Sequence, residues 1–150
     1  MAYTAAAEDG IEPVSDSVWE IVANIANYNV VSGCGVTYSA ANMTATIAAG
    51  VVTHNGVSVA VAGNSVTLVA DSSNPRWTWI YSNSSGTAAI TSGDPLAVPT
   101  VPELGDNVAL ALVKVNAAAT IANDITYKLD KRIIAPSGGI SIGAGWFNFG

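Results

Sequence analysis

Few residues of this chain have side chains suited to catalysis or metal binding. His54 is the only histidine and Cys34 the only cysteine. A nucleophilic triad needs a histidine that is held by an acid and touches a nucleophile, and zinc needs about four thiolate or imidazole ligands. His54 precedes Asn55-Gly56, a turn sequence, so we interpret it as a loosely held surface residue. Cys34, between two glycines, is interpreted as a small buried or turn residue.

The acidic residues do not show the spacing of a metal or catalytic site. The D-x-D-x-D-G pattern of a calcium loop is absent from the sequence. Asp9 with Glu12, or Asp71 with Asp94, would need the fold to bring them together, and so would the paired carboxylates of a hydrolase. Few acids fall within predicted strands. We therefore predict that the protein is not an enzyme and has no catalytic residue, metal or cofactor.

One predicted strand carries an aromatic row with two opposed interpretations. Trp77, Trp79 and Tyr81 alternate along the chain and so fall on one face of the strand, with Ile80 on the other. An exposed row of this kind can stack on sugar rings, as a receptor-binding protein requires. A row at strand spacing more often fills a core, which is the interpretation we favour. If the row were exposed around a groove, the sugar-binding interpretation would be favoured.

The composition favours contacts with other protein molecules. Half of the 150 residues are hydrophobic and only 11% are charged, against about a quarter in typical soluble domains. The net charge of −6 argues against nucleic acid, whose binding needs a track of Lys and Arg. No uninterrupted apolar run reaches the about 18 residues of a membrane helix. We predict a self-associating chain, the alternative being a monomer with a nearly neutral surface.

The start of the sequence does not resemble an export signal. Met1-Ala2-Tyr3-Thr4 has neither the basic nor the apolar region of a signal peptide. A single cysteine allows no intrachain disulfide, so nothing indicates an oxidising compartment. We expect synthesis in a cytosol without export.

The elements that carry these residues fall into three predicted regions. Residues 1–28 are expected to be an arm and a short helix, since Val18, Val22 and Ile25 recur at helical spacing after the capping candidates Ser15 and Asp16. Residues 29–134 alternate apolar and polar side chains in short strands separated by turns. Residues 135–150 combine glycines with aromatic residues and are expected to be a tail. The predicted fold is all-β, an antiparallel jelly-roll-like β-sandwich with one N-terminal helix and extended terminal arms.

Particular segments within 29–134 give sharper predictions. Asn55-Gly56 predicts a two-residue hairpin turn with positive φ at both positions. Residues 107–115 form the most continuously apolar strand, which predicts an interior place in a sheet. Pro95, Pro99 and Pro102 predict an extended connection outside any sheet. Residues 117–124 predict a short helical turn, and 125–134 a last strand.

The two terminal regions hold the predicted contact residues. Left free, the aromatic side chains of the tail would expose apolar area, so the tail is expected to dock, either on a neighbouring subunit or on its own sheet. The candidate contacts with other subunits or with a capsid are Trp19, Trp146, Phe147 and Phe149.

The order of these features resembles a known family. A helix is followed by Val30-Val31-Ser32-Gly33 and by short Val/Ala/Thr strands. The most specific features come next, Asn74-Pro75-Arg76 before an apolar strand and then Pro99-x-x-Pro102, and Asn123-Asp124-Ile125 follows. Over about residues 28–132 the chain resembles the jelly-roll-like domain of tailed-phage structural proteins, which include head-decoration, head-fibre, tail-fibre and baseplate components. The Gly/aromatic tail departs from the family's usual ending.

The resemblance implies a non-enzymatic homotrimer fixed to a virion. We predict a capsid decoration or head fibre protein that binds itself and the major capsid protein or other virion proteins, and that binds neither nucleic acid nor membrane. It would be assembled into the virion in the host bacterial cytoplasm. The alternative is a tail fibre or baseplate component that binds a host-surface glycan.

Overall fold

The computed structural model describes residues 27–134, 141–143 and 146–148. Within them the chain is all-β, and every pair of named strands is antiparallel, as the alternating sequence predicts. Apart from Asn27, helical structure in these residues is limited to the 3-10 turn η1 (Ala122–Asp124), which confirms the turn expected within 117–124. No helix in the described part combines the length and the apolar character needed to cross a lipid bilayer.

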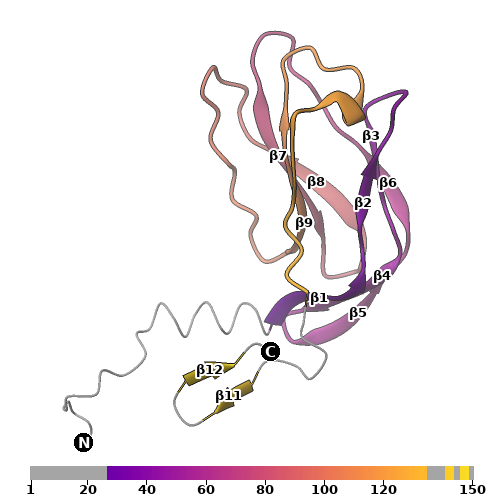
Figure 1. The fold of residues 1–150 in the computed structure, drawn as a ribbon, viewed down its shortest axis with the longest axis vertical. Coiled ribbons are helices and arrows are strands. Elements are labelled where there is room, and N and C mark those ends of the chain that lie inside the picture. The colour runs from indigo at the N-terminus through magenta and orange to yellow at the C-terminus, as the bar shows by residue number, and fades with distance from the viewer. Residues whose placement is uncertain (1–26, 135–140, 144–145, 149–150) are drawn as a thin grey trace, which may run out of the picture.

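The first six strands form one antiparallel meander of three long strands, each interrupted near its middle. They are β1 (Tyr28–Gly33), β2 (Val36–Tyr38), β3 (Thr44–Ile47), β4 (Gly50–His54), β5 (Val57–Val61) and β6 (Asn64–Thr67). β1, β4 and β5 form one sheet in that order, and β2, β3 and β6 form the next in the matching order. Each long strand (β1 with β2, β3 with β4, β5 with β6) is interrupted by only two residues. The interruptions lie side by side, so all three long strands bend at the same level. This level lies between the lower and the upright strands of Figure 1.

Small residues at this level allow the bend. Gly33 and Cys34 both have positive φ, at 65° and 62°, which breaks the extended backbone. A Cβ on Gly33 would lie 2.2 Å from the Ala49 carbonyl oxygen, and a Cβ on Gly50 would lie 2.2 Å from the Ser32 carbonyl oxygen. The backbones therefore approach too closely for any side chain, which is why glycines stand at both positions.

The second group of strands is a four-stranded sheet in the order β10-β9-β7-β8. Its members are β7 (Arg76–Ser82), β8 (Ala88–Ser92), β9 (Val108–Val115) and β10 (Tyr127–Asp130). β9 lies between β10 and β7, which confirms the interior place predicted for the most apolar strand. β10 is shorter than the strand expected over 125–134, since it ends at Asp130, and it is not the last, because β11 (Ser141–Gly143) and β12 (Trp146–Asn148) follow it.

Residues 93–107 cross the outer face of this sheet. β8 and β9 lie on opposite sides of β7, so the chain that joins them must pass over β7. The Gly93 N–H donates to the Trp77 carbonyl at 2.8 Å, and the Trp79 Nε1–H donates to the Pro102 carbonyl at 2.8 Å. No strand is assigned within 93–107, as the prolines predict.

One hydrophobic core joins the two groups of strands. Its fully buried members on the meander include Val30, Ile47 and Val52, and those on the four-stranded sheet include Ile80 and Val113. Thr78 and Ser82 are also fully buried on the Ile80 face of β7. At the Thr78–Ser92 pair, where β7 meets β8, the two hydroxyl groups lie 3.0 Å apart, which satisfies the buried Thr78 oxygen.

The domain has two distinct ends (Figure 1). At the terminus end, the segments 1–26 and 135–140 join the described chain next to each other, because Val30 forms a bridge with Ile134. The β4–β5 turn lies at this end too, where the Gly56 N–H donates to the Asn27 carbonyl. The opposite end, called here the η1 end, holds η1 and the segment from Asn116 to Ala118.

The predicted arm, helix and tail fall largely outside the described residues. The helix expected within 1–28 and the residues Trp19 and Phe149 lie outside them. Trp146 and Phe147 fall in β12 (Trp146–Asn148), which pairs with β11 (Ser141–Gly143) in a two-stranded antiparallel sheet. The domain limits at 28 and 134 stay a prediction.

Candidate binding surfaces

The aromatic row of β7 does not fill the core. Thr78, Ile80 and Ser82 occupy the buried face, whereas Trp77 and Tyr81 on the opposite face are half-buried. The expectation of a core row was therefore wrong. The reason is the crossover 93–107, which covers this face and binds the indole of the half-buried Trp79 through Pro102. The row is not an open aromatic surface either, because the crossover forms a hydrogen bond with Trp79, the middle residue of the row.

Lys114 lies at the η1 end of the same face and contacts two aromatic rings. It pairs with Trp77 on one side and Tyr127 on the other across three strands. Lys114 Nζ is 5.9 Å from the Trp77 ring centroid and 5.7 Å from that of Tyr127, within the range of a cation–π contact. Within the described part of the chain, this ammonium has neither an ion-pair partner nor a hydrogen-bond acceptor. Its three N–H donors are therefore open to water or a ligand.

Two neighbouring hollows open at this end. The first has a volume of about 230 Å³. Its lining residues are Pro75, Lys114, Asn116, Ala117, Thr126 and Tyr127. The second, also about 230 Å³, is lined by residues from Asn116 to Ile125 and shares Asn116 with the first. Ala118, which lines the second hollow, has a φ of 55° and donates its N–H to the Asp71 carbonyl at 2.7 Å, which holds the backbone in a conformation that alanine rarely adopts.

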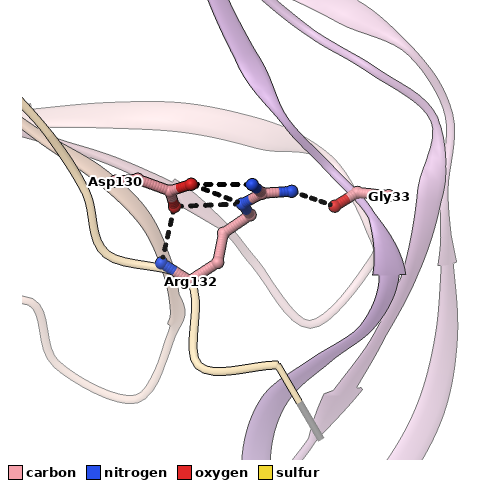
Figure 2. Close-up of polar contacts among 3 residues, drawn as sticks. All are labelled: Gly33, Asp130 and Arg132. Atoms are coloured by element: carbon pink, nitrogen blue, oxygen red, sulfur yellow. Dashed lines mark hydrogen bonds and ion pairs between the residues drawn. The ribbon is translucent and has the colours of Figure 1, made fainter.

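A polar corner joins β10 to the meander on the inner side of the sheet (Figure 2). The Arg132 guanidinium donates to both carboxylate oxygens of Asp130, with its shortest contact at 2.7 Å, and donates through Nη1 to the Gly33 carbonyl at 2.9 Å. The Arg132 guanidinium lowers the pKa of the Asp130 carboxyl, and Asp130 in turn raises the pKa of Arg132. Arg132 thereby ties the end of β10 to the turn of the meander.

Tyr38 and Lys128 complete this corner. Lys128 Nζ lies 5.1 Å from the Tyr38 ring centroid and donates to the Asn123 carbonyl. Partial burial, together with the nearby Asp130 carboxylate, raises the pKa of Tyr38 to about 12. These residues line a cleft of about 370 Å³ with Arg132. Its cations are already paired, because Arg132 is bound to Asp130 and Lys128 to a backbone carbonyl.

Cys34 confirms its interpretation as a buried residue at a turn. It is a free thiol with no exposed surface. Burial raises its pKa above the ordinary value, and the charge of Arg132 acts in the opposite direction. A buried thiol held in its neutral form is a poor nucleophile.

His54 is held more firmly than the sequence suggests. It ends β4 beside the hairpin turn, but its Nε2 lies 2.6 Å from the Asp106 carbonyl oxygen and its ring meets that of Tyr28 edge to face at 5.2 Å. The imidazole therefore ties β4 and β1 to the end of the crossover. His54 does lie at the surface beside the turn, but the expectation of a loosely held side chain was wrong, because the crossover returns to this end of the domain.

A groove of about 400 Å³ lies next to this contact at the terminus end. It is lined by Tyr28 and Asn29 of β1, by residues 104–109, and by Lys131 and Ile133. Four aliphatic side chains at this end are exposed, Val57 at 62%, Ile134 at 51%, Ile133 at 48% and Val31 at 47%, although Val98 of the crossover is more exposed still, at 84%. The terminus end thus presents apolar surface where both terminal segments join the domain.

Of the acidic candidates, Asp9 and Glu12 lie outside the described residues. In the described residues, no group of three or more His, Cys, Asp or Glu side chains could hold a metal ion. Asp71 caps a turn instead, accepting from the Ser73 and Asn74 N–H groups, and these bonds lower its pKa. The contacts of Lys114 with Trp77 and Tyr127, and the hydrogen bond of Arg132 to Gly33, could not be predicted from the sequence, since each joins segments that lie far apart in the chain.

Comparison with known proteins gives no family for this chain. No protein-family model matches it, and no curated protein matches it significantly.

Proposed function

We propose that this chain is a non-enzymatic structural protein that assembles with copies of itself, as a capsid decoration or head fibre protein of a tailed bacteriophage. The observation that supports self-assembly is the set of exposed aliphatic side chains at the terminus end, of which Val57 and Ile134 are more than half exposed. Single exposed apolar residues are ordinary on any protein. Several at the end where both terminal segments join, in a chain with 11% charged residues, favour burial against other subunits.

The proposed partners follow from this surface and from the family resemblance. A homotrimer would bury the aliphatic side chains of the terminus end between copies, and the terminal segments would contact the major capsid protein or other virion proteins. Attachment through several simultaneous contacts makes release slow, because all of them must break together. The proposed location is the virion.

The finer architecture belongs to the same proposal. Two groups of antiparallel strands that share one core support a β-sandwich, and the resemblance supports the jelly-roll-like type. The first group of strands runs as a meander, whereas in the four-stranded sheet the crossover places β9 beside β7.

The alternative of a glycan-binding tail component loses its original basis. It required Trp77, Trp79 and Tyr81 to form an open row around a groove. All three are half-buried, and the Trp79 indole is bound to the crossover.

Imaging of the virion tests the assignment. We expect labelled protein on the head, and binding of purified protein to empty capsids that lack it. Labelling confined to tail tips, with no binding to capsids, would replace decoration by the tail alternative. Absence from purified particles would refute a virion role altogether.

A further inference from the structure

We propose that the hollow beside Lys114 at the η1 end binds an acidic sugar residue, with Lys114 as the contact for its carboxylate. This site does not depend on self-assembly, since it lies at the end of β9 away from the terminus end. It also differs from the aromatic row, of which it uses only the end next to Trp77.

The size of the hollow fits one small ring. Its volume is about 230 Å³, below the about 300–1,000 Å³ of pockets for drug-sized ligands. The second hollow shares Asn116 with it and is lined by Asp124 as well, so it offers room for a neutral next unit of a chain. A linear oligosaccharide has such a repeating shape.

The lining combines an apolar platform with hydrogen-bonding groups. The Tyr127 side chain is 55% exposed although it is large and aromatic, so its ring can pack against the apolar face of a sugar ring. Asn116 and Thr126 contribute an amide and a hydroxyl group, and Pro75 closes the wall without adding a donor. This balance of one ring face with a few polar groups suits a polyhydroxylated ligand.

The charge of Lys114 selects an acidic ligand. Trp77 and Tyr127 hold the ammonium between their rings, which reduces the side-chain entropy lost on binding. Arg132 donates to the Asp130 carboxylate, and Lys128 donates to the Asn123 carbonyl. Among the described residues, the Lys114 ammonium has no such acceptor. A carboxylate on the sugar would supply that acceptor, and a neutral sugar would not.

Titration of the full chain with methyl glycosides of glucuronic acid and N-acetylneuraminic acid tests the proposal, with methyl glucoside as the neutral control. Amide chemical shifts in ¹⁵N-labelled protein locate the site without any substitution. We expect a dissociation constant of about 1 mM or lower for at least one acidic glycoside. The shifts should cluster at residues 114–117 and 126–127, and binding should weaken as salt is raised.

Three substitutions test the site against its surroundings. Lys114→Gln should weaken binding by about tenfold or more, because a charge-assisted hydrogen bond is lost. Lys128→Gln is the matched control: it also removes a lysine stacked on a tyrosine ring, but outside the hollow, and should leave binding within about twofold. Tyr127→Ala should weaken binding to a similar degree as Lys114→Gln, and thermal unfolding checks that each variant is folded.

Three results would overturn the proposal. They are the absence of shifts with both acidic glycosides, equal binding of methyl glucoside, and equal loss of binding in Lys114→Gln and Lys128→Gln. None of these would bear on self-assembly, which is measured separately by mass in solution.

Discussion

Arg132 is expected to stabilise the fold chiefly through one backbone carbonyl rather than through its ion pair. The perturbation that tests this is Arg132→Met, which keeps the apolar stem and removes the guanidinium. The Asp130 side chain is 60% exposed, so the ion pair should contribute only about 0.3–1 kcal/mol. The Arg132 side chain is 26% exposed, and its bond to Gly33 should add about 1 kcal/mol. The variant should therefore lose about 1.3–2 kcal/mol of unfolding free energy.

Urea denaturation at neutral pH measures this loss, and thermal melting should show a fall of about 3–8 °C. Asp130→Asn removes the ion pair but leaves the Gly33 bond, and should cost about 0.5 kcal/mol. Lys131→Met is the neighbouring control, since Lys131 is exposed and should change stability by less than about 0.5 kcal/mol. A stabilising role of the Gly33 bond is refuted if Arg132→Met stays within that margin, or if Asp130→Asn costs as much as Arg132→Met.

Three further predictions concern backbone strain and pH. Gly33→Ala should cost about 3 kcal/mol or more in urea denaturation, because the new Cβ would meet the Ala49 carbonyl at a φ of 65°; Gly35→Ala, whose Cβ has only the Arg132 side chain nearby, should cost less than about 1 kcal/mol. Ala118→Gly should raise stability by about 0.5–1 kcal/mol in the same assay, since it relieves a φ of 55°, and a loss would contradict that strain. The pKa of Tyr38, raised from 10.0 to about 12, favours the folded state below pH 10, and this contribution is lost as pH rises to 12. Partial exposure limits the loss to about 1–2 kcal/mol. The unfolding free energy of Tyr38→Phe should change less between about pH 10 and pH 12 by that amount, and equal pH profiles of the two proteins would refute this role.

Local signals in the sequence correctly predicted several elements. Asn55 and Gly56 take positive φ values of 50° and 78°, and His54 pairs with Val57 across the turn, as an Asn-Gly hairpin requires. The strand predicted over 107–115 lies inside its sheet, and its side chains on both faces are largely buried, as its continuous apolar sequence requires. Such features depend on neighbouring residues alone, so a single sequence suffices to predict them.

Features set by distant segments could not be predicted in this way. Alternation placed Trp77 and Ile80 on opposite faces of β7, but the course of the crossover 93–107 decided which face is buried. The contact of Arg132 with Gly33 joins residues at opposite ends of the domain sequence. Lys114 gains its two aromatic neighbours only through the register of β9 with β7 and β10. Register and crossover path are properties of the whole chain.

Self-assembly is tested most directly by sedimentation of the full chain over a wide range of protein concentration. We expect a mass above that of the 15.2 kDa monomer, with a trimer as the main species, and weaker association when the exposed Ile133 and Ile134 are both replaced by serine. Val69→Ser, a change at a half-exposed valine beyond β6, is the control and should leave the mass unchanged. A strictly monomeric chain at the highest concentration would rule out self-assembly.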